Sequence, residues 1–426
     1  MNSIMAQMKL RQWIISYFLM ILMGLLLFQA DTYQPTDKVE QYRVFTRMLE
    51  FDYVSWTFNA FLIKGEQSSL DAVQYLPQAS QTKIVLDYLE LVRKIEDTQD
   101  QVDQIYSDPA VSNPRQKADK LLKELSSLSD DQSRLGPLSE TVLQQQTSQI
   151  LAENHLTLGG QPIPPLLYRV TPLPMALIIS PRNVIRQDAN ISLLPGLSLD
   201  QVVLLENEVE KTFNVSALVT NVGGIGDYPT MVLSTTDMDF LSNTIAHEWT
   251  HNFLTLRPLG LDYDTSPDLR TMNETTASIV GKEIGLDVLN RYYPQFAPAP
   301  PPVQQPQNNN PQPDNAPAKF DFRKEMHITR LAVDQMLAAG KIKEAESYME
   351  SRRKFFWDNG YQIRRLNQAY FAFNGAYADE PGGAAGADPV GPAVRALRQQ
   401  SASLADFLNR ISWMTSLADL QQALKK

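Results

Sequence analysis

The chain has 426 residues, of which 43% are hydrophobic and 20% are charged, and its formal net charge is −10. This length is enough for about two or three domains with ordinary hydrophobic cores. The negative charge argues against nucleic-acid binding, and the absence of cysteine excludes disulfides, thiol nucleophiles and cysteine-ligated zinc. Any metal ligand in this chain must therefore be a histidine or a carboxylate.

The first predicted element is an uncharged segment over residues 12–30. At ~1.5 Å per residue, a helix of this length crosses the core of a lipid bilayer. Cations precede the segment and an aspartate follows it, so the positive-inside rule places the N-terminus in the cytoplasm. A cleaved signal peptide is the alternative, but the bulky Phe28 would occupy its −3 position. Residues 1–36 are therefore predicted to be a cytoplasmic tail and an uncleaved transmembrane anchor.

Residues 37–158 are predicted to form a helical stalk or bundle, because apolar residues recur at helical spacing between Pro and Gly breaks. The last two helices are expected to be separate, over RQKADKLLKELSSL and LSETVLQQQTSQILAEN. His155 stands alone near the end of this region. It is expected to be a surface or capping histidine rather than a ligand.

At Gly159 the composition changes to turn-forming residues, which indicates a domain boundary. Residues 159–296 are predicted to form a small sheet with one helix, followed by a histidine-containing helix. The expected elements are three short strands, over residues 176–179, 183–194 and 215–219, and a helix over residues 199–213. No Gly-Lys-Ser/Thr follows the glycines at 223–226, so we expect a turn beside an edge strand rather than a phosphate loop.

Residues 297–318 are rich in proline and are expected to form a solvated linker. Residues 319–426 are predicted to be a C-terminal helical subdomain. It begins with a pair of helices that end at Gly340 and Gly360, and it closes with two further helices. The whole chain is therefore predicted to be mainly α, with a small α+β subdomain.

Two of the four histidines, His247 and His251, lie four residues apart, with Glu248 directly after the first. At that spacing both imidazoles lie on one face of a helix and can hold one metal ion, while Glu248 reaches a water bound to it. Burying these groups together without a partner would be costly, and a metal ion removes that cost. The competing interpretation is a helix that carries ordinary core or surface histidines.

Catalytic zinc usually takes three protein ligands and a water, so a third ligand is needed. Arg257 stands six residues after His251, where a metzincin has its third histidine. The remaining candidates are carboxylates: Asp262, Asp264 and Asp268 on an apparent loop, and Glu274 near the start of a second helix. The helix face that begins at Glu274 continues with small residues that would allow close approach to the first helix, namely Ala277, Ser278, Gly281 and Gly285.

The motif His247-Glu248-Trp-Thr-His251, followed 23 residues later by Glu274 of an Asn-Glu pair, resembles the gluzincin metallopeptidases, the clan of thermolysin and aminopeptidase N. The resemblance implies a zincin-like catalytic subdomain, one zinc ion held by His247, His251 and Glu274, and Glu248 as general base. Ser278 stands where thermolysin-like enzymes have an aspartate, and the Gly-Ala-Met-Glu-Asn stretch of the aminopeptidases is missing. Exopeptidase specificity therefore does not transfer, and a divergent bacterial family is implied.

We therefore predict a zinc metallopeptidase, anchored in the cell membrane by one helix, with its catalytic part outside the cytoplasm. It would hydrolyse peptide bonds through a zinc-activated water, with Glu248 as general base. The expected partner is a peptide or protein substrate, and the sequence sets no oligomeric state. Two alternatives stay open: a catalytically silent, membrane-tethered interaction protein on the same scaffold, and a zinc hydrolase of non-peptide amides or esters.

A tetrahedral oxyanion would need a further donor. In the resembled clan this is often a Tyr or His from the C-terminal helical part, and the candidates here are Tyr370, Tyr377 and Asn367, followed by His327. Each of these aromatics can instead be core packing. Behind the ligands, Asn273 and Ser278 are the first partners expected.

Overall fold

The computed structural model describes residues 37–69, 73–107, 111–298, 320–380 and 382–425. It is mainly helical, with 64% helix, 8% strand and small sheets, which confirms the predicted mainly α class. The predicted membrane segment at 12–30 and most of the proline-rich segment at 297–318 lie outside the described residues. None of the helices in the described part of the chain combines the length and the apolarity needed to cross a membrane.

The chain divides into two compact units, residues 1–48 and residues 49–426. The described helix of the first unit is α2 (Lys38–Thr46), which begins at the N-cap Asp37, whose side chain accepts from the backbone N–H of Val39. All other elements, and the candidate site, belong to the second unit.

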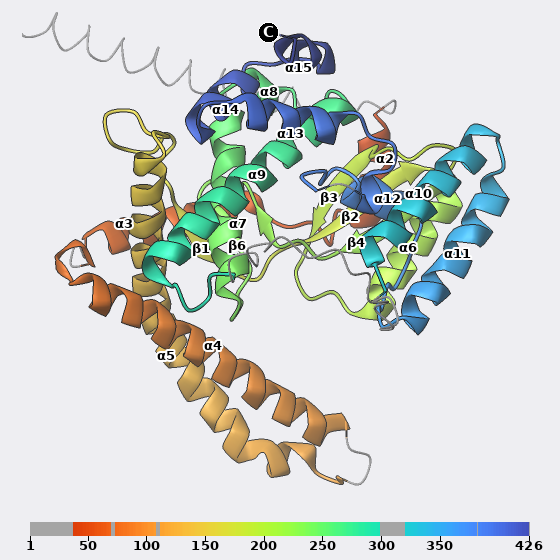
Figure 1. Cartoon of the computed structure of the whole chain (residues 1–426). Coiled ribbons are helices and arrows are strands. Elements are labelled where there is room, and N and C mark those ends of the chain that lie inside the picture. Colours follow the sequence, from red (N-terminus) through yellow and green to blue (C-terminus); the bar gives the residue numbers. More distant parts are fainter. Residues whose placement is uncertain (1–36, 70–72, 108–110, 299–319, 381, 426) are drawn as a thin grey trace, which may run out of the picture. The chain divides into compact units, whose positions relative to one another are not determined.

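Among its described residues, the second unit begins with three long α-helices and one short 3₁₀ helix (Figure 1). They are α3 (Tyr53–Ser69), a short 3₁₀ helix η1 (Val73–Tyr75), α4 (Gln78–Ser107) and α5 (Pro114–Glu153). The predicted break within α5 is wrong, because the helix continues through Pro137. A proline inside a helix costs ~3 kcal/mol, but α4 packs along α5 and buries residues on both sides of this position, such as Leu143. His155 follows α5 as an exposed residue with φ of 58°.

Two three-stranded sheets replace the single sheet that was expected. The first has the antiparallel order β3-β2-β4, with β2 (Met175–Pro181), β3 (Ala189–Leu193) and β4 (Val215–Thr220). The second has the order β1-β6-β5, with β1 (Tyr168–Val170), β5 (Gly224–Ile225) and β6 (Thr230–Val232).

The connections of the first sheet follow from local side-chain bonds. The predicted strand over 183–194 begins only at Ala189, because the residues before it form a turn in which the N–H of Arg186 donates to Ser180 Oγ (3.2 Å). Helix α6 (Leu199–Phe213) has the predicted bounds. Ser198 and Gln201 form a capping box at its start.

Next come α7 (Met238–Thr255), α8 (Pro258–Leu261) and α9 (Pro267–Tyr292). Helix α9 begins earlier than expected, because Ser266 caps it and accepts from the N–H of Leu269 (3.2 Å). The small residues of α9 do allow the close approach that was predicted. A β-carbon on Gly285 would come within 2.9 Å of the backbone of Asn243 in α7.

All the regular elements that the structure describes in the C-terminal part are helices. Its helices are α10 (Phe322–Ala338), α11 (Ile342–Asp358), α12 (Gln368–Asn374), η2 (Gly383–Ala385), α13 (Val390–Gln400), α14 (Leu404–Ile411) and α15 (Leu417–Ala423). Gly340 and Gly360, with φ of 72° and 90°, follow α10 and α11 as predicted. The described end of the chain has three helices rather than two, because Ser416 caps an additional one by accepting from Asp419 (3.2 Å).

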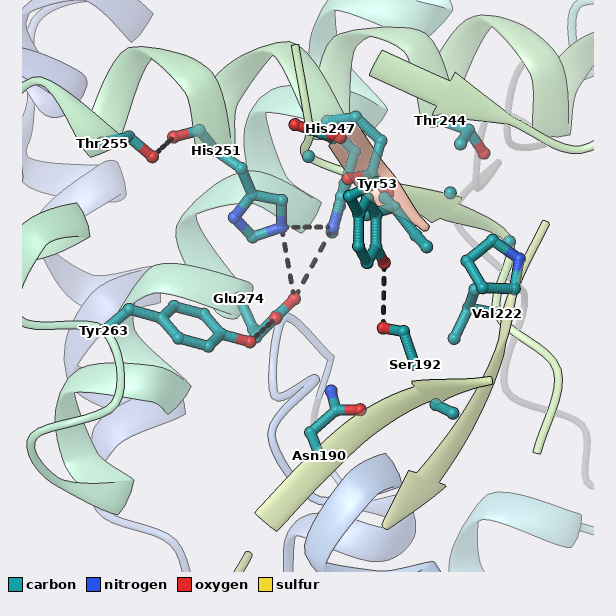
Figure 2. Close-up of a pocket in the computed structure, with 18 of the residues that line it drawn as sticks. Tyr53, Asn190, Ser192, Val222, Thr244, His247, His251, Thr255, Tyr263 and Glu274 are labelled. Carbon is teal, nitrogen blue, oxygen red and sulfur yellow. Dashed lines mark hydrogen bonds and ion pairs between the residues drawn. The ribbon is translucent and has the colours of Figure 1, made fainter. Parts of the chain in front are cut away.

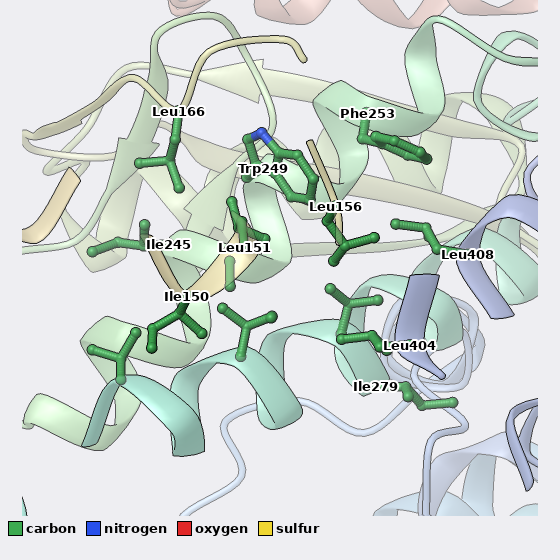
Figure 3. Packing of buried hydrophobic residues seen from close by; sticks show 14 of the residues in the cluster. Ile150, Leu151, Leu156, Leu166, Ile245, Trp249, Phe253, Ile279, Leu404 and Leu408 are labelled. Carbon is green, nitrogen blue, oxygen red and sulfur yellow. The ribbon is translucent and has the colours of Figure 1, made fainter. Parts of the chain in front are cut away.

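One hydrophobic core joins regions that are far apart in the sequence (Figure 3). Leu151 of α5, Trp249 of α7 and Leu408 of α14 are members of this core. The predicted N-terminal helical region, the α+β region and the C-terminal helical region therefore all contribute side chains to one core. Helices α7 and α9, which carry the candidate ligands, both contribute side chains to this core.

Candidate metal centre

Helix α7 is buried along most of its length, and its rotation is fixed by specific contacts. Asp237 caps its N-terminus by accepting from the N–H groups of Asp239 (3.0 Å) and Phe240 (3.1 Å). The indole of Trp249 is buried in the core and donates to the carbonyl of Pro164 (2.9 Å). With Trp249 held on the core side, His247 and His251 lie toward the cavity.

The structure brings the three predicted ligands together (Figure 2). The Nε2 atoms of His247 and His251 are 3.1 Å apart. Glu274 Oε2 lies 3.6 Å from the first and 3.5 Å from the second. In the described part of the chain, His247, His251 and Glu274 are the three His, Asp or Glu side chains that lie close enough together to share one ion. The alternative ligands Asp262 and Asp264 are not part of this group.

Asn273 stands behind His251, as predicted for a partner of the ligands. Its Oδ1 lies 2.7 Å from His251 Nδ1, and its Nδ2 donates to the carbonyl of Leu259 (3.2 Å). The donation to Leu259 fixes which end of the amide faces the imidazole. In the neutral imidazole, His251 Nδ1 must therefore carry the hydrogen, and Nε2 then presents a lone pair to the other two ligand atoms.

Two residues outside the predicted site complete the surroundings of Glu274. The Tyr263 hydroxyl donates to Glu274 Oε1. Arg270 Nε donates to the Tyr263 hydroxyl (3.3 Å), and Arg270 also donates to the carbonyl of Ala372 (2.9 Å). Glu274 Oε1 is thus satisfied, whereas Oε2 is buried, has no hydrogen-bond partner and faces the histidines.

Glu248 lines the cavity close to β5. The glycine segment predicted as a turn beside an edge strand forms that edge strand itself, at Gly224–Ile225. A β-carbon on Gly224 would come within 2.8 Å of Glu248 Cγ and Cδ. One on Gly226 would come within 2.8 Å of His251 Cβ. Only glycine therefore lets the backbone pass this close to α7.

The charges of the cluster shift one another's pKa values. Burial raises the pKa of the Glu248 carboxyl above its usual value. Burial also acts to raise the pKa of Glu274, but attraction to His251 and His247 outweighs it and holds that pKa well below the usual range. Burial acts to lower the pKa of His251, whereas Glu274 raises it, and the result is a pKa of about 9. The cluster therefore attracts positive charge.

The cluster opens into a cavity of about 1180 Å³. Tyr377 lines it, and the tyrosine ring lies 6.2 Å from the His247 ring, at 28° to it. Tyr370 is not among the described residues that line the cavity; it packs against two hydrophobic clusters, and burial raises its pKa to about 12.

The other candidates from the C-terminal part also lie outside the cavity lining. Asn367 caps α12 and donates to the carbonyl of Ala217 (2.9 Å), so its role is structural. His327 belongs to α10 and is not among the described lining residues. Ser278 is buried on α9, one turn beyond Glu274.

Comparison of the chain with protein families, with curated proteins and with solved structures finds no match.

Proposed function

We propose that this chain is a zinc-dependent metallopeptidase in which His247, His251 and Glu274 hold the metal and Glu248 is the general base. The observation that carries the proposal is the spacing of the three ligand atoms, 3.1, 3.5 and 3.6 Å. An ion at the centre of a tetrahedron with bonds of ~2.0–2.1 Å holds its ligand atoms about 3.3 Å apart. The two sheets together with α7 and α9 would form a zincin-like subdomain.

The chemistry of the donor set also supports an ion. In its neutral form His251 presents a lone pair at Nε2, because its Nδ1–H is engaged by Asn273. Glu274 Oε2 is buried and has no hydrogen-bond partner. Buried acceptors that face one another are unfavourable unless a cation lies between them. Two imidazoles and one carboxylate are ligands that zinc accepts, and they leave one coordination position for water.

The zinc ion, when bound, supplies a Lewis acid that polarises a peptide carbonyl and lowers the pKa of a coordinated water. The chain's own residues supply the rest. Glu248 follows a ligand directly and lines the cavity, so its carboxylate can take the proton of the attacking water and deliver it to the leaving amine. Tyr377, beside His247, is the described candidate from the C-terminal part for donating to the oxyanion.

We further propose, from the sequence, that residues 12–30 anchor the chain in the cell membrane and that the catalytic part lies outside the cytoplasm. This part of the proposal rests on the apolar segment and its flanking charges. A protease-protection assay on sealed cells tests it: the part after residue 36 should be digested from outside.

Two measurements on the full chain test the catalytic proposal. Metal analysis should find about one zinc per chain, and Glu274→Ala should lose it while Asp264→Ala keeps it. Glu248→Gln should keep zinc and lower kcat for peptide hydrolysis by about 10²–10⁴-fold, with the exposed Glu208→Gln as the matched control. A zinc-free wild-type chain would refute the metal site, and undiminished hydrolysis by Glu248→Gln would refute the general base.

A further inference from the structure

The cavity has a second wall that the proposed catalysis does not use. Helix α3 contributes Val54, Phe58 and Phe61 to the lining of the same cavity that holds the histidines and Glu248. These side chains follow one another at helical spacing of four and three residues, so they share one face of α3. They are 82%, 66% and 45% exposed.

Polar bonds hold α3 in this position. Tyr53 donates to Ser192 of β3 (2.9 Å), as Figure 2 shows, and Thr57 donates to Asp227 (3.1 Å) in the loop beside Glu248. Farther along, Lys64 donates to Glu140 of α5 (2.8 Å). Tyr53, Thr57 and Lys64 thus tie α3 to the rest of the unit, while Val54, Phe58 and Phe61 of the same helix line the cavity. These bonds hold the wall in place without a ligand.

An apolar wall that is held in place and stays largely exposed in the described part of the chain indicates a ligand with apolar groups of its own. Large apolar side chains in a row on a cavity wall are unfavourable in water, and an apolar group that covers them recovers that free energy. Val222, Ile225 and Phe240 line the same cavity and extend its apolar surface.

The size of the cavity indicates an extended ligand. Its volume of about 1180 Å³ exceeds the ~300–1,000 Å³ of pockets for drug-sized molecules. A peptide of several residues can therefore reach Glu248 with its backbone and α3 with a side chain. Leu62 is also apolar and 54% exposed on α3, but it is not among the described lining residues, so the wall is one face of the helix and not the helix as a whole.

We propose that the α3 wall, Val54, Phe58 and Phe61, determines specificity by binding bulky apolar side chains of peptide substrates. The inference rests on the proposed peptidase function, since it names the substrates of that same cavity. A helix from the N-terminal helical region, outside the proposed catalytic subdomain, would then select which peptides reach the metal.

The test measures binding, so that it does not depend on catalysis. The full chain with Glu248→Gln is titrated with two fluorescein-labelled octapeptides that differ only in their central pair, Phe-Leu or Ser-Gln. The apolar peptide is expected to bind at least about 10-fold more tightly. Phe58→Ala with Phe61→Ala should reduce this ratio about 10-fold, because the wall loses two aromatic rings.

Three controls sharpen the result. Leu62→Ala removes an equally exposed apolar side chain from the same helix and should leave the ratio unchanged. Phe58→Leu with Phe61→Leu should restore most of the affinity ratio, because leucine keeps the wall apolar. This result would show that the double alanine variant loses apolar surface and not its fold. Thermal melts followed by circular dichroism establish that each variant is folded.

The proposal is overturned if the parent chain does not prefer the apolar peptide, if the double alanine variant keeps the full ratio, or if Leu62→Ala lowers the ratio as much. These outcomes are distinct from failure of the peptidase proposal. If the chain binds zinc and cleaves peptides but does not use the wall, only the specificity inference is refuted. If the chain binds the apolar peptide through the wall but holds no zinc, only the proposed zinc peptidase function is refuted.

Discussion

Gly281 of α9 lies directly against His247 of α7: a β-carbon on the glycine would come within 3.0 Å of the histidine β-carbon. It would also come within 2.6 Å of Asn243 Oδ1 and 3.0 Å of the Asn243 carbonyl oxygen. The missing side chain therefore sets the distance between the helix that carries the two histidines and the helix that carries Glu274. The geometry of the ligand triangle depends on this contact.

Gly281→Ala is expected to force α7 and α9 apart at the site. Added volume in a packed interior costs about 1–3 kcal/mol, so the free energy of unfolding should fall by that amount in urea titrations. Zinc affinity, measured by competition with a chelator, should fall as well, because His247 moves relative to Glu274. Gly65→Ala is the matched control. Gly65 also lies inside a helix, but a β-carbon there would meet no neighbouring side chain or helix within 4 Å, so this substitution should stabilise the chain by up to ~1 kcal/mol. Equal effects of the two substitutions would contradict the close-contact argument.

Asn273 should matter for the metal although it is not a ligand. Asn273→Ala removes the acceptor that fixes the His251 ring, and loss of such a partner typically lowers metal affinity about 10–100-fold. Asn273→Asp keeps an acceptor 2.7 Å from His251 Nδ1 and should retain more of the affinity, although it loses the donor to Leu259. The measurement is the same chelator competition. An Asn273→Ala chain with wild-type affinity would show that Asn273 does not orient His251.

The parts that could be predicted from the sequence are those that local spacing decides. Two histidines four residues apart must share a helix face, and small residues after Glu274 permit close helix packing. The bounds of α6 follow from its capping box and its apolar periodicity. Spacing alone therefore predicts the two histidine ligands, whereas the choice of Glu274 among the nearby carboxylates follows from the resemblance to the gluzincins.

The rest depends on contacts between distant parts of the chain. Tyr263 lies between two aspartates on a turn, and nothing local indicates that its hydroxyl reaches Glu274. Arg270 joins it to the carbonyl of Ala372, which is 102 residues away. Pro137 predicts a helix break, and only the packing of α4 along α5 explains why none occurs. Tertiary contacts overrode local propensity in each case.

Tyr263→Phe is expected to lower zinc affinity about 10-fold with little loss of stability. The substitution keeps the ring but removes the hydroxyl that donates to Glu274 Oε1, so the carboxylate loses the bond that aims Oε2 at the histidines. Tyr75→Phe, the same change at a tyrosine that is 79% exposed, should leave the affinity unchanged. Wild-type affinity in Tyr263→Phe would mean that packing alone positions Glu274.

The buried pair of Lys64 and Glu140 is expected to hold α3 in place more strongly than any exposed pair does. Lys64 Nζ lies 2.8 Å from Glu140 Oε2, and the two side chains are 3% and 5% exposed. Lys64→Met leaves the carboxylate buried with its main cation removed, which costs about 3–5 kcal/mol. Glu140 Oε1 still accepts from the N–H of Val170 (2.9 Å), and Arg169 lies 3.7 Å away, so the loss should fall toward the lower end of that range.

Lys83→Met supplies the matched comparison. Lys83 forms an ion pair of 2.6 Å with Asp87 on α4, but these side chains are 71% and 52% exposed. An exposed helical pair contributes only about 0.3–0.5 kcal/mol, because water screens both charges and solvates whichever one remains. Urea titration of the full chain should therefore separate the two variants by several-fold in their loss of unfolding free energy. If Lys64→Met cost no more than Lys83→Met, the fixed position of the α3 wall could not be attributed to this pair.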